Sequence, residues 1–394
     1  MVLLVINSGS SSIKYKIFDF EKGALIKKGI ADRIGLMGSR FTDHDTAIRF
    51  ILKGLPVIGA VGHRVVHGGE RFKRSVLIDK SVIKAIERFS ELAPLHNPPN
   101  LLGIKACRRH LAHVPQAAVF DTAYYATLPE SHYIYAIPYA LYKRYGIRRY
   151  GFHGSSHKYV AMKTTEVLKK APSGLKIITC HLGNGCSITA TAGGRAADTS
   201  MGFTPLEGLV MGTRSGDIDP ACALYLMEKK KMSPREADTL LNKQSGLLGV
   251  SGRSSDMRDI YAAVIKKNKR AILAFEIFIH RIHKYIGAFS AVMDGVDAIT
   301  FTGGIGENHP PTREAVCRNL GFLGAKIDCA KNRRNAAVIS KPGSKVKILV
   351  VPTDEELMIA KETAEVINSL SPRPAERDPA TRESGERVRV RGLR

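Results

Sequence analysis

A short polar segment near the start of the chain carries residue types that suit phosphate chemistry. Residues 7–12, Asn-Ser-Gly-Ser-Ser-Ser, separate the apolar run 2–6 from residues 13–20, which begin by alternating apolar and polar side chains. This pattern predicts a strand, a small-residue turn and a second strand. The turn offers backbone N–H groups, hydroxyls and, just beyond it, the Lys14 ammonium, a donor set that suits phosphate oxygens. It is not a Walker P-loop, which needs GxxxxGK[ST] before a helix, and an ordinary Ser/Gly hairpin turn explains it equally well.

Charged side chains recur beside glycines further along the chain. Arg64 lies within GHRVVHGG, residues 62–69, where a guanidinium between two histidines needs an anion for balance. Asp121 ends an apolar run, and an acidic residue at the carboxyl end of a strand often faces a site, with helix capping as the structural alternative. His153 and His157 flank a small-residue turn, for which a metal pair and a capping turn are both reasonable interpretations.

Two stretches are dense in Gly, Ser, Thr and Asp outside any regular pattern. The first includes residues 181–185, 198–205 and 211–217, and such density indicates a ligand-lined cleft rather than plain loops. The second is FTGGIGEN, residues 301–308, in which an apolar strand runs into a Gly-Gly-x-Gly turn that allows close approach by a nucleotide. One Gly-rich turn is weak evidence, but together with the phosphate-type turn it favours a nucleotide site.

The elements that must hold these residues alternate between strand and helix patterns. Strand-like runs recur at residues 57–61, 117–120, 177–181, 187–190, 298–301 and 346–351, and helical patterns at residues 81–92, 233–241, 270–293 and 355–370. Strands mixed with helices predict an α/β fold. Each half of the chain contains a strand, a Gly-rich turn and another strand, at residues 7–12 and 181–186, so the halves share a coarse plan.

Length and composition exclude several classes of protein. A chain of 394 residues is long enough for two domains with large cores. No apolar run approaches the roughly 18 residues of a membrane span, and residues 2–6 are too short for a signal-peptide core. We therefore expect a cytoplasmic protein without a membrane partner. The six cysteines show neither CxxC nor zinc spacing and are expected to be reduced thiols.

The formal net charge of +24 is high for a metabolic enzyme and raises a nucleic-acid hypothesis. The basic residues are scattered in short runs such as 229–231 and 266–270, and no RNA-stacking motif, zinc finger or basic zipper accompanies them. Solvated helix faces are the favoured interpretation and attraction of anionic substrates the second, so no specific nucleic-acid partner is expected. Residues 371–394 are rich in Pro, Arg and Glu and predict a disordered basic tail.

Taken together, these segments resemble the acetate kinase family of the actin, sugar kinase and Hsp70 ATPase superfamily. The resemblance rests on ordered blocks at residues 7–12, 62–69, 92–100, 120–123, 151–157, 181–185, 211–217, 254–258, 302–308 and 352–356. It implies a two-domain actin-like (ribonuclease H-like) ATPase fold with duplicated mixed-sheet domains and a central cleft. The expected N-terminal domain is residues 1–125 plus 358–370, and the expected C-terminal, nucleotide-binding domain is residues 126–357.

The resemblance also implies an activity and a set of site residues. The activity is reversible, direct in-line transfer of the ATP γ-phosphoryl group to acetate, giving acetyl phosphate and ADP, with Mg²⁺ or alternatively Mn²⁺, in a homodimer. The implied catalytic residues are Asp121, His153 and Arg214. The implied substrate-binding residues are Arg64 and the methyl pocket of Val66, Leu95, Phe152 and Pro205. The implied metal-site residues are Asn7 and Glu355. The implied nucleotide-binding residues are Ser10, Ser12, Lys14, His181, Leu182, Gly183, Asn184, Gly185, Asp256, Met257, Arg258, Gly304, Ile305, Gly306, Glu307 and Asn308.

The chemistry itself restricts the roles of these residues. A carboxylic acid with a pKa near ~4–5 is already ionised at neutral pH, so acetate needs no general base. Asp121 is therefore expected to position a metal, a water or an arginine rather than to activate acetate. Arg64, Arg214 and the histidines then supply the donors and positive charge that two mutually repelling anions require.

Several alternatives stay open at this point. A kinase for propionate or another short-chain fatty acid of the same fold is the nearest, because one methylene changes binding by only about 1–3 kcal/mol. An ATP-dependent binding or chaperone module would not need the cluster that residues 64–67 and 153–157 form with Arg214. The chain also departs from the family pattern at Tyr124-Tyr125, where Phe-His is common, which puts a contact near Asp121 in question.

Overall fold

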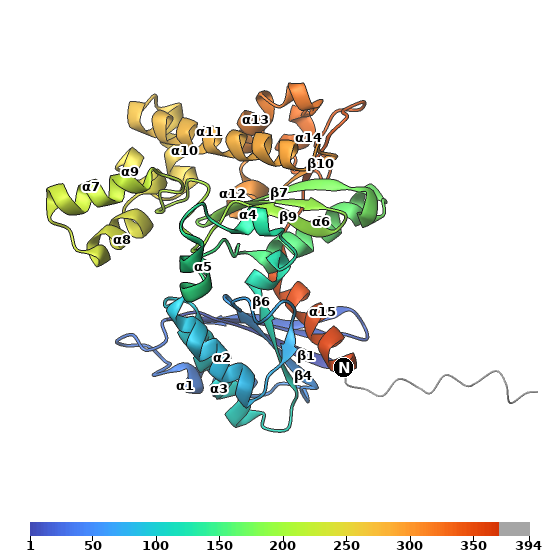
Figure 1. Ribbon diagram of the computed structural model, residues 1–394. Helices are drawn as coiled ribbons and strands as arrows, with labels where there is room; N and C mark the ends of the chain where they lie inside the picture. Colours follow the sequence, from blue (N-terminus) through green and yellow to red (C-terminus); the bar gives the residue numbers. More distant parts are fainter. Residues whose placement is uncertain (370–394) are drawn as a thin grey trace, which may run out of the picture.

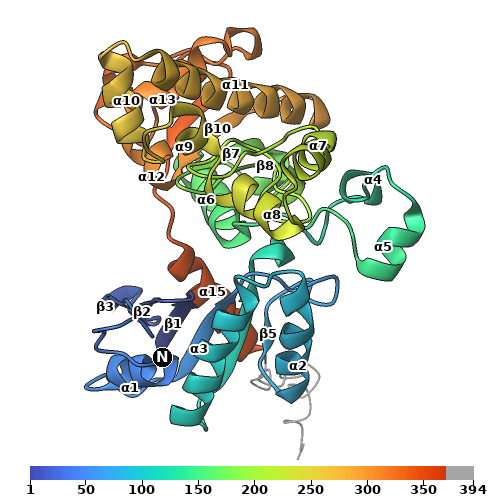
Figure 2. The same cartoon turned by 90° about the vertical axis from the view of Figure 1, so that its left-hand side faces the viewer.

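The computed structural model describes residues 1–369, which form two lobes separated by a waist (Figures 1 and 2). The predicted basic tail at residues 371–394 lies outside the described residues. Each lobe contains one mixed β-sheet covered by helices, which confirms the α/β prediction. No helix within residues 1–369 combines the length and apolar character needed to cross a bilayer. All six cysteines have free thiols.

The N-terminal lobe is built on a six-stranded sheet of order β3-β2-β1-β4-β6-β5. Its strands are β1 (Val2–Ser8), β2 (Ile13–Asp19), β3 (Ala24–Ala31), β4 (Ala60–Val65), β5 (Val76–Leu77) and β6 (Gln116–Phe120), and its helices are α1 (His44–Leu52), α2 (Lys80–Arg88) and α3 (Asn97–His110). The predicted strand at residues 57–61 begins only at Ala60, because Val57 is 92% exposed and precedes the pairing with β1.

The first strand explains how this lobe is layered. Leu3 and Val5 pack with Ile359 of α15 (Glu355–Asn368) on one face of the sheet. Leu4 and Ile6 pack on the other face in a cluster that includes α1 residues. A strand covered on both faces reads as a continuous apolar run instead of an alternating one, which is why residues 2–6 show no alternation.

The C-terminal lobe is built on a five-stranded sheet of order β11-β10-β7-β8-β9. Its strands are β7 (Lys176–Leu182), β8 (Cys186–Ala192), β9 (Arg195–Thr199), β10 (Ala298–Thr302) and β11 (Lys347–Val350). Its helices are α6 (Gly154–Leu168), α7 (Pro220–Lys230), α8 (Pro234–Lys243), α9 (Gly246–Ser251), α10 (Met257–Ile265), α11 (Lys269–Val292), α12 (Gly303–Asn308), α13 (Pro310–Arg318) and α14 (Cys329–Arg333). The short α4 (Glu130–Tyr133) and α5 (Tyr139–Tyr145) project from its side (Figure 2).

The two sheets repeat one plan. In each sheet, three neighbouring strands are antiparallel, and two further strands continue the sheet in parallel from the third. The order is β3-β2-β1-β4-β6 in one lobe, with β4 parallel to β1, and β9-β8-β7-β10-β11 in the other, with β10 parallel to β7. The turn between β1 and β2 therefore corresponds to the turn between β7 and β8. The coarse plan expected from the sequence is present as a structural duplication.

Helix α15 joins the lobes. It leaves the C-terminal sheet after β11, packs on β1, β4 and β6 of the N-terminal sheet, and also contacts α6. Lys158 of α6 donates to Glu362 of α15 at 2.7 Å, and Ser75 donates to the other oxygen of the same carboxylate. The N-terminus of α15, which carries Glu355, consequently lies at the waist.

Candidate active site

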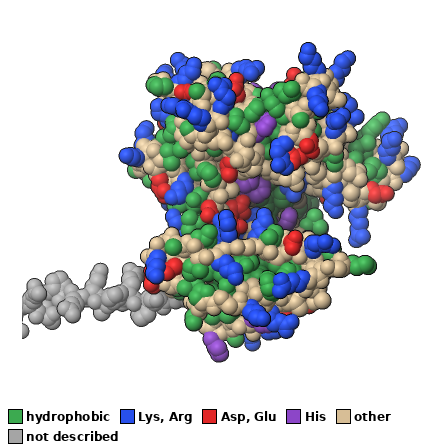
Figure 3. Space-filling model, turned by 180° about the vertical axis from the view of Figure 1, so that it is seen from behind, with side chains coloured by type: hydrophobic (Ala, Val, Ile, Leu, Met, Phe, Trp, Pro, Cys, Tyr) green, Lys and Arg blue, Asp and Glu red, His purple; other side chains and the backbone are tan. Residues whose placement is uncertain are grey.

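The parallel strands of both sheets end at the space between the lobes, where the space-filling view shows a hollow containing histidine, acidic and basic side chains (Figure 3). In the N-terminal sheet, β4 ends beside Arg64 and β6 ends immediately before Asp121. In the C-terminal sheet, β7 is followed by a turn at residues 183–185, and β10 ends at Thr302, immediately before Gly303. The duplicated plan thus brings segments far apart in sequence to one cleft.

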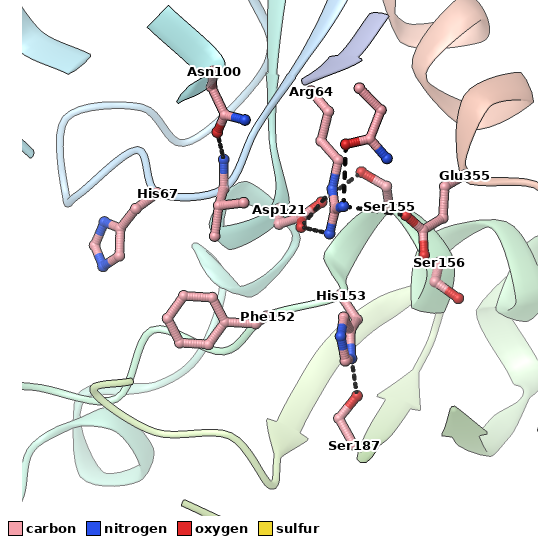
Figure 4. Close-up of polar contacts among 12 residues, drawn as sticks. Arg64, His67, Asn100, Asp121, Phe152, His153, Ser155, Ser156, Ser187 and Glu355 are labelled. Atoms are coloured by element: carbon pink, nitrogen blue, oxygen red, sulfur yellow. Dashed lines mark hydrogen bonds and ion pairs between the residues drawn. The ribbon is translucent and has the colours of Figure 1, made fainter. Parts of the chain in front are cut away.

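Arg64 and Asp121 form the best-defined contact of this cleft (Figure 4). Arg64 donates from Nε at 3.0 Å and from Nη2 at 2.7 Å to Asp121 Oδ2. Ser155 at the start of α6 donates to the other carboxylate oxygen, Oδ1, at 2.9 Å. Because Asp121 is buried and both of its oxygens are engaged, it holds the guanidinium in a fixed orientation.

Asn7 and Glu355 lie on the other side of the same guanidinium. Arg64 Nη1 is 3.4 Å from Asn7 Oδ1 and 3.8 Å from Glu355 Oε2. Burial raises the pKa of Glu355, which Arg64 partly offsets. Burial alone would lower the pKa of Arg64, but the carboxylates of Asp121 and Glu355 raise it, so the guanidinium stays charged.

Oxygen donors of this kind fit a magnesium ion. Within residues 1–369 no group of three His, Cys, Asp or Glu side chains could hold a metal on its own. Mg²⁺ is usually bound by one or two protein carboxylates together with substrate phosphates. An amide oxygen and a half-buried carboxylate that both lie against Arg64 Nη1 therefore suit a metal that arrives with a nucleotide.

Two histidines face this cluster from the C-terminal lobe. The rings of His153 and His181 stack with their centroids 4.5 Å apart. His153 Nδ1 is hydrogen-bonded to Ser187 Oγ at 2.8 Å, and His181 Nδ1 to Ser156 Oγ at 2.8 Å. Burial, followed by the neighbouring His181 and the arginines, holds the pKa of His153 well below its ordinary value. Burial and Arg64 lower the pKa of His181 to about 4.

Arg214 completes the cationic side of the cleft. A Cβ placed on Gly185 would lie 3.5 Å from His153 Nε2 and 3.6 Å from Arg214 Nη1, so both groups converge over that glycine. Within residues 1–369 no carboxylate oxygen lies within salt-bridge distance of Arg214; its Nη1 donates to Pro205 O at 3.4 Å. Burial lowers the pKa of Arg214. A half-buried guanidinium without a carboxylate partner is suited to an anionic ligand.

A pocket of about 510 Å³ adjoins this cluster in the C-terminal lobe. Half of the residues expected to bind nucleotide line it, namely Gly183, Asn184, Asp256, Met257, Arg258, Gly304, Ile305 and Asn308. Ser255 and His309, which the sequence did not single out, line it as well. Gly303 has φ of 77°, and a Cβ there would come within 2.7 Å of the Leu182 backbone, so this turn requires glycine.

Other residues expected at the nucleotide lie elsewhere. Leu182 and Gly306 are buried. Glu307 Oε1 accepts hydrogen bonds from Gly303 N at 2.8 Å and Thr353 N at 3.1 Å, so this carboxylate ties the β10 turn to the segment after β11. A carboxylate engaged by backbone amides is a structural element of the turn.

The phosphate-type turn lies in the N-terminal lobe, across the cleft from that pocket. Asn7 and Lys14 are directly opposed in the β1–β2 ladder. Gly9 N donates to Ser12 O at 2.7 Å, which closes the turn, and Ser10 is exposed at its tip. Lys14, Ser10 and Ser12 therefore belong to the N-terminal lobe, and none of the three lines that pocket.

The expected methyl pocket is only partly assembled. Val66 and Phe152 are buried in one apolar cluster, and Val66 N donates to Asn100 Oδ1 at 3.1 Å. Pro205 lies beside Arg214 through its carbonyl. Leu95 is 63% exposed and belongs to none of the apolar clusters of residues 1–369, so it does not pack with Val66 and Phe152 in the core.

Sequence reasoning missed the polar side chains that orient the site. Ser155, Ser156 and Ser187 contact Asp121, His181 and His153 respectively. Ser187 sits inside a strand that reads as core, and no spacing rule separates it from its neighbours. His96 lies in the family-like block at residues 92–100, and burial, Arg64 and Arg214 lower its pKa, which places it near the cluster.

The Tyr124-Tyr125 pair, atypical for the resemblance, packs the segment after β6 against the C-terminal sheet. The Tyr125 hydroxyl donates to Phe152 O at 2.8 Å, and the Tyr124 hydroxyl lies 2.9 Å from Thr191 Oγ1. The hydroxyls of both tyrosines therefore bind residues of the C-terminal lobe, Phe152 and Thr191 of β8, instead of the Asp121 carboxylate.

Known proteins are similar to this chain in sequence and in fold. The model of the Acetokinase family matches residues 2–361. The acetate kinase of Thermotoga maritima is 55% identical, covering 94% of this chain and 100% of that protein. Among solved structures, Porphyromonas gingivalis acetate kinase matches with a TM-score of 0.89 at 45% identity, covering 93% and 99% of the two chains. A propionate kinase from Francisella tularensis matches with a TM-score of 0.87 at 40% identity over the same shares. These matches confirm the predicted fold of two mixed-sheet domains around a cleft, and the chain belongs to the acetokinase family.

Proposed function

We propose that this protein is an acetate kinase, which reversibly transfers the γ-phosphoryl group of ATP directly to acetate and forms acetyl phosphate and ADP. The observation that carries the proposal is the arrangement of Arg64, fixed by Asp121, opposite His153 and Arg214, next to a glycine-lined pocket. Two anions can meet in such a cleft because positive charge and N–H donors surround the point where they react.

The proposed mechanism assigns most of the work to positioning. Acetate enters as an anion and needs no base, since carboxylic acids with a pKa near ~4–5 are ionised at neutral pH. Asp121 already binds Arg64 through one oxygen and Ser155 through the other. Its role is therefore to hold the arginine that orients the acetate carboxylate. His153, His181 and Arg214 contact the transferring phosphoryl group from the opposite wall.

Asn7 and Glu355 would hold a Mg²⁺ ion, with Mn²⁺ as the alternative, and the metal would neutralise phosphate charge. Lys14, Ser10 and Ser12 are placed to contact nucleotide phosphates from the N-terminal lobe. Adenosine would lie in the pocket lined by Gly304 and Asp256. Glu307 and Leu182 would support that pocket from behind.

Propionate kinase activity is the second candidate function, and two observations support it. The Francisella tularensis propionate kinase is 40% identical to this chain. Leu95 is 63% exposed and does not pack with Val66 and Phe152, so it does not close their apolar wall against a longer acyl chain. One extra methylene is worth only about 1–3 kcal/mol, so the two acids differ in rate rather than in kind.

The proposal also covers the domain boundaries, the location and the oligomeric state of the protein. The N-terminal domain would comprise residues 1–125 and 358–370 and the C-terminal domain residues 126–357, with α15 returning to the first sheet. We further propose a cytoplasmic homodimer, in keeping with an ATP substrate and six free thiols.

Trapping of the acyl phosphate with hydroxylamine tests the proposal. The protein is incubated with ATP, Mg²⁺ and acetate, propionate or butyrate, and the hydroxamate is quantified. We expect the highest kcat/KM with acetate, a lower value with propionate and the lowest with butyrate. Absence of hydroxamate from every acid would refute kinase activity on short-chain acids, and a preference for propionate would favour the second candidate.

A further inference from the structure

A chain of four buried or half-buried polar side chains runs away from the cleft behind His153. His153 Nδ1 is hydrogen-bonded to Ser187 Oγ at 2.8 Å, and the same oxygen is hydrogen-bonded to His157 Nε2 at 2.8 Å. His157 Nδ1 is hydrogen-bonded to Thr179 Oγ1 at 2.6 Å. Ser187, His157 and Thr179 are fully buried, so no water competes for these bonds.

Each hydroxyl has one hydrogen and each neutral imidazole one N–H, so the chain has two consistent polarities. In the first, Thr179 donates to His157 Nδ1, His157 Nε2–H donates to Ser187, and Ser187 donates to His153 Nδ1. His153 then carries its hydrogen on Nε2. In the second, every bond is reversed, and His153 presents an unprotonated Nε2 to the cleft.

The distances favour the first polarity. In the reversed chain the Thr179 hydrogen is left for Thr189 O at 3.4 Å, which exceeds the usual range of about 2.5–3.0 Å for an O–H donor. In the first polarity that hydrogen lies in the 2.6 Å contact with His157 Nδ1. A phosphoryl oxygen near Nε2 would also accept from Nε2–H, whereas it would be repelled by a nitrogen lone pair.

We infer that Thr179, His157 and Ser187 are positioning residues that fix the tautomer of His153, so that a neutral imidazole presents Nε2–H to the transferring phosphoryl group. The inference rests on the proposed function, in which His153 contacts that group. Nε2 makes no hydrogen bond to any residue within 1–369 and lies near Arg214 Nη1 across Gly185. A donor there adds to the guanidinium in stabilising phosphoryl oxygens.

A neutral donor suits this position because it is surrounded by other cations and imidazoles. His181 stacks on the ring, His157 lies behind it, and Arg64 and Arg214 face it from either side of the cleft. A positive charge on His153 would be repelled by these two guanidinium groups. A neutral N–H donates without that repulsion and needs no proton uptake before the reaction.

The ring tautomer can be observed directly by NMR. Full-length protein labelled with ¹⁵N at histidine is examined at neutral pH, without ligand and with acetyl phosphate, and the His153 resonances are assigned by comparison with His153→Gln. We expect a neutral ring with hydrogen on Nε2 and none on Nδ1. An imidazolium, or a ring with hydrogen on Nδ1, overturns the inference whether or not the protein is an active kinase.

Variants at Ser187 connect the tautomer to turnover. Ser187→Ala removes the hydroxyl that links the two histidines, and Ser187→Thr keeps it on a strand that already carries Thr189 and Thr191. We expect Ser187→Ala to lower kcat about 10- to 100-fold, less than the 10²–10³ typical of deleting a donor outright, with the KM for ATP and acetate little changed. Ser187→Thr should retain both the tautomer and kcat.

The outcomes separate positioning from general structural damage. A folded Ser187→Ala protein with unchanged tautomer and kcat overturns the inference. If Ser187→Ala does not fold, the wild-type spectrum and Ser187→Thr still decide the question. Failure of wild-type protein to form hydroxamate from any short-chain acid would refute the proposed function, while the NMR result would stand on its own.

Discussion

Arg64 is the residue on which the geometry of the cleft depends, because it contacts Asn7, Asp121 and Glu355 together. Its planar guanidinium donates two hydrogen bonds to one Asp121 oxygen, and its Nη1 points toward the oxygens of Asn7 and Glu355. We predict that both Arg64→Ala and Arg64→Lys lower kcat by about 10²–10³, since a lysine ammonium cannot reproduce the fork. Hydroxamate formation under saturating ATP and acetate measures the effect.

Comparing kcat of Arg64→Ala with that of Arg64→Lys separates the effect of charge from the effect of the guanidinium geometry. If charge alone mattered, Arg64→Lys would keep most of the activity. Near-normal turnover of the lysine variant would therefore show that the fork held by Asp121 is not required. Arg71, which lies on the exposed surface nearby in sequence, supplies a control, and Arg71→Lys should leave kcat unchanged.

Buried histidines make stability depend on pH. Burial lowers the pKa of His63 to about 4 and that of His67 to about 3, against an ordinary value of 6.5. Between the folded and unfolded pKa values the unfolded chain binds protons that the folded protein does not. Stability is therefore complete above pH 6.5 and falls below it, by up to about 1.4 kcal/mol per pH unit for each such histidine.

Urea unfolding at several pH values between neutrality and pH 4 checks this prediction. His63 is hydrogen-bonded to Gln116 Oε1 at 2.9 Å, and glutamine at position 63 also has an N–H donor for it. His63→Gln should thus show a shallower loss of stability on acidification. Equal pH slopes for the two proteins would contradict a role for His63.

Individual residues also show where sequence reasoning stops. Four residues were predicted from motifs whose charged or imidazole side chains can react or bind whether they are buried or exposed. They are Arg64, Asp121, His153 and Arg214, and they meet in one cleft. Ser187 was not, because a serine in a buried strand has no sequence pattern that distinguishes it from core. The 63% exposure of Leu95 and the backbone amides bound by Glu307 were likewise not predictable, since burial and hydrogen-bond partners depend on the folded chain.

At the scale of elements, the close approach of α15 to β4 positions Glu355. A Cβ on Gly62 of β4 would overlap Thr363 Oγ1 and lie 3.0 Å from Ile359 Cγ2 of α15. We predict that Gly62→Ala costs about 1–3 kcal/mol of stability by overpacking and lowers kcat by displacing the helix that carries Glu355. Urea unfolding and hydroxamate formation measure the two effects.

A second glycine provides the matched control. Gly287 lies within α11, and no other atom is within 4 Å of a Cβ placed on it. Gly287→Ala should stabilise the protein by about 0.5–1 kcal/mol through helix propensity, with unchanged kcat. If Gly62→Ala behaved like Gly287→Ala, the packing of α15 on β4 would not be tight enough to position the site.

Elements were predicted well where periodicity and caps coincide. Ser233 begins α8 with a capping box, Asn268 caps α11, and Asp354 caps α15, all close to the expected starts. The pairing of strands was not predictable in detail, because β1 joins β4 across residues that are distant in sequence. The duplicated order of the two sheets likewise emerges only from tertiary pairing.

At the scale of the whole molecule, the cleft needs both lobes. The N-terminal lobe supplies Arg64, Asp121 and the phosphate-type turn, while the C-terminal lobe supplies the histidines, Arg214 and the glycine-lined pocket. Ser155 donates to Asp121 across the waist, and Glu355 reaches Arg64 from the helix that joins the lobes. The site is therefore built by the docking of two similar sheets rather than within either one.

The net charge of +24 belongs to this scale as well, and it has a consequence for anionic substrates. Screening shortens the range of electrostatic attraction from about 30 Å at 0.01 M salt to about 8 Å at 0.15 M. We predict that the KM for ATP rises by roughly tenfold over that change, because a basic surface concentrates anions near the cleft, whereas kcat at saturation changes little. Steady-state rates at several salt concentrations provide the measurement.

Removing charge far from the cleft tests whether the overall field is responsible. Lys229, Lys230 and Lys231 are exposed at the end of α7, and replacing all three with glutamine removes three positive charges without touching a site residue. The triple variant should show a higher KM for ATP at low salt and a weaker salt dependence, with kcat unchanged. A salt dependence identical to that of the wild type would instead assign the attraction to Arg64, Arg214 and Lys14 alone, because only charges near the bound phosphates would then contribute.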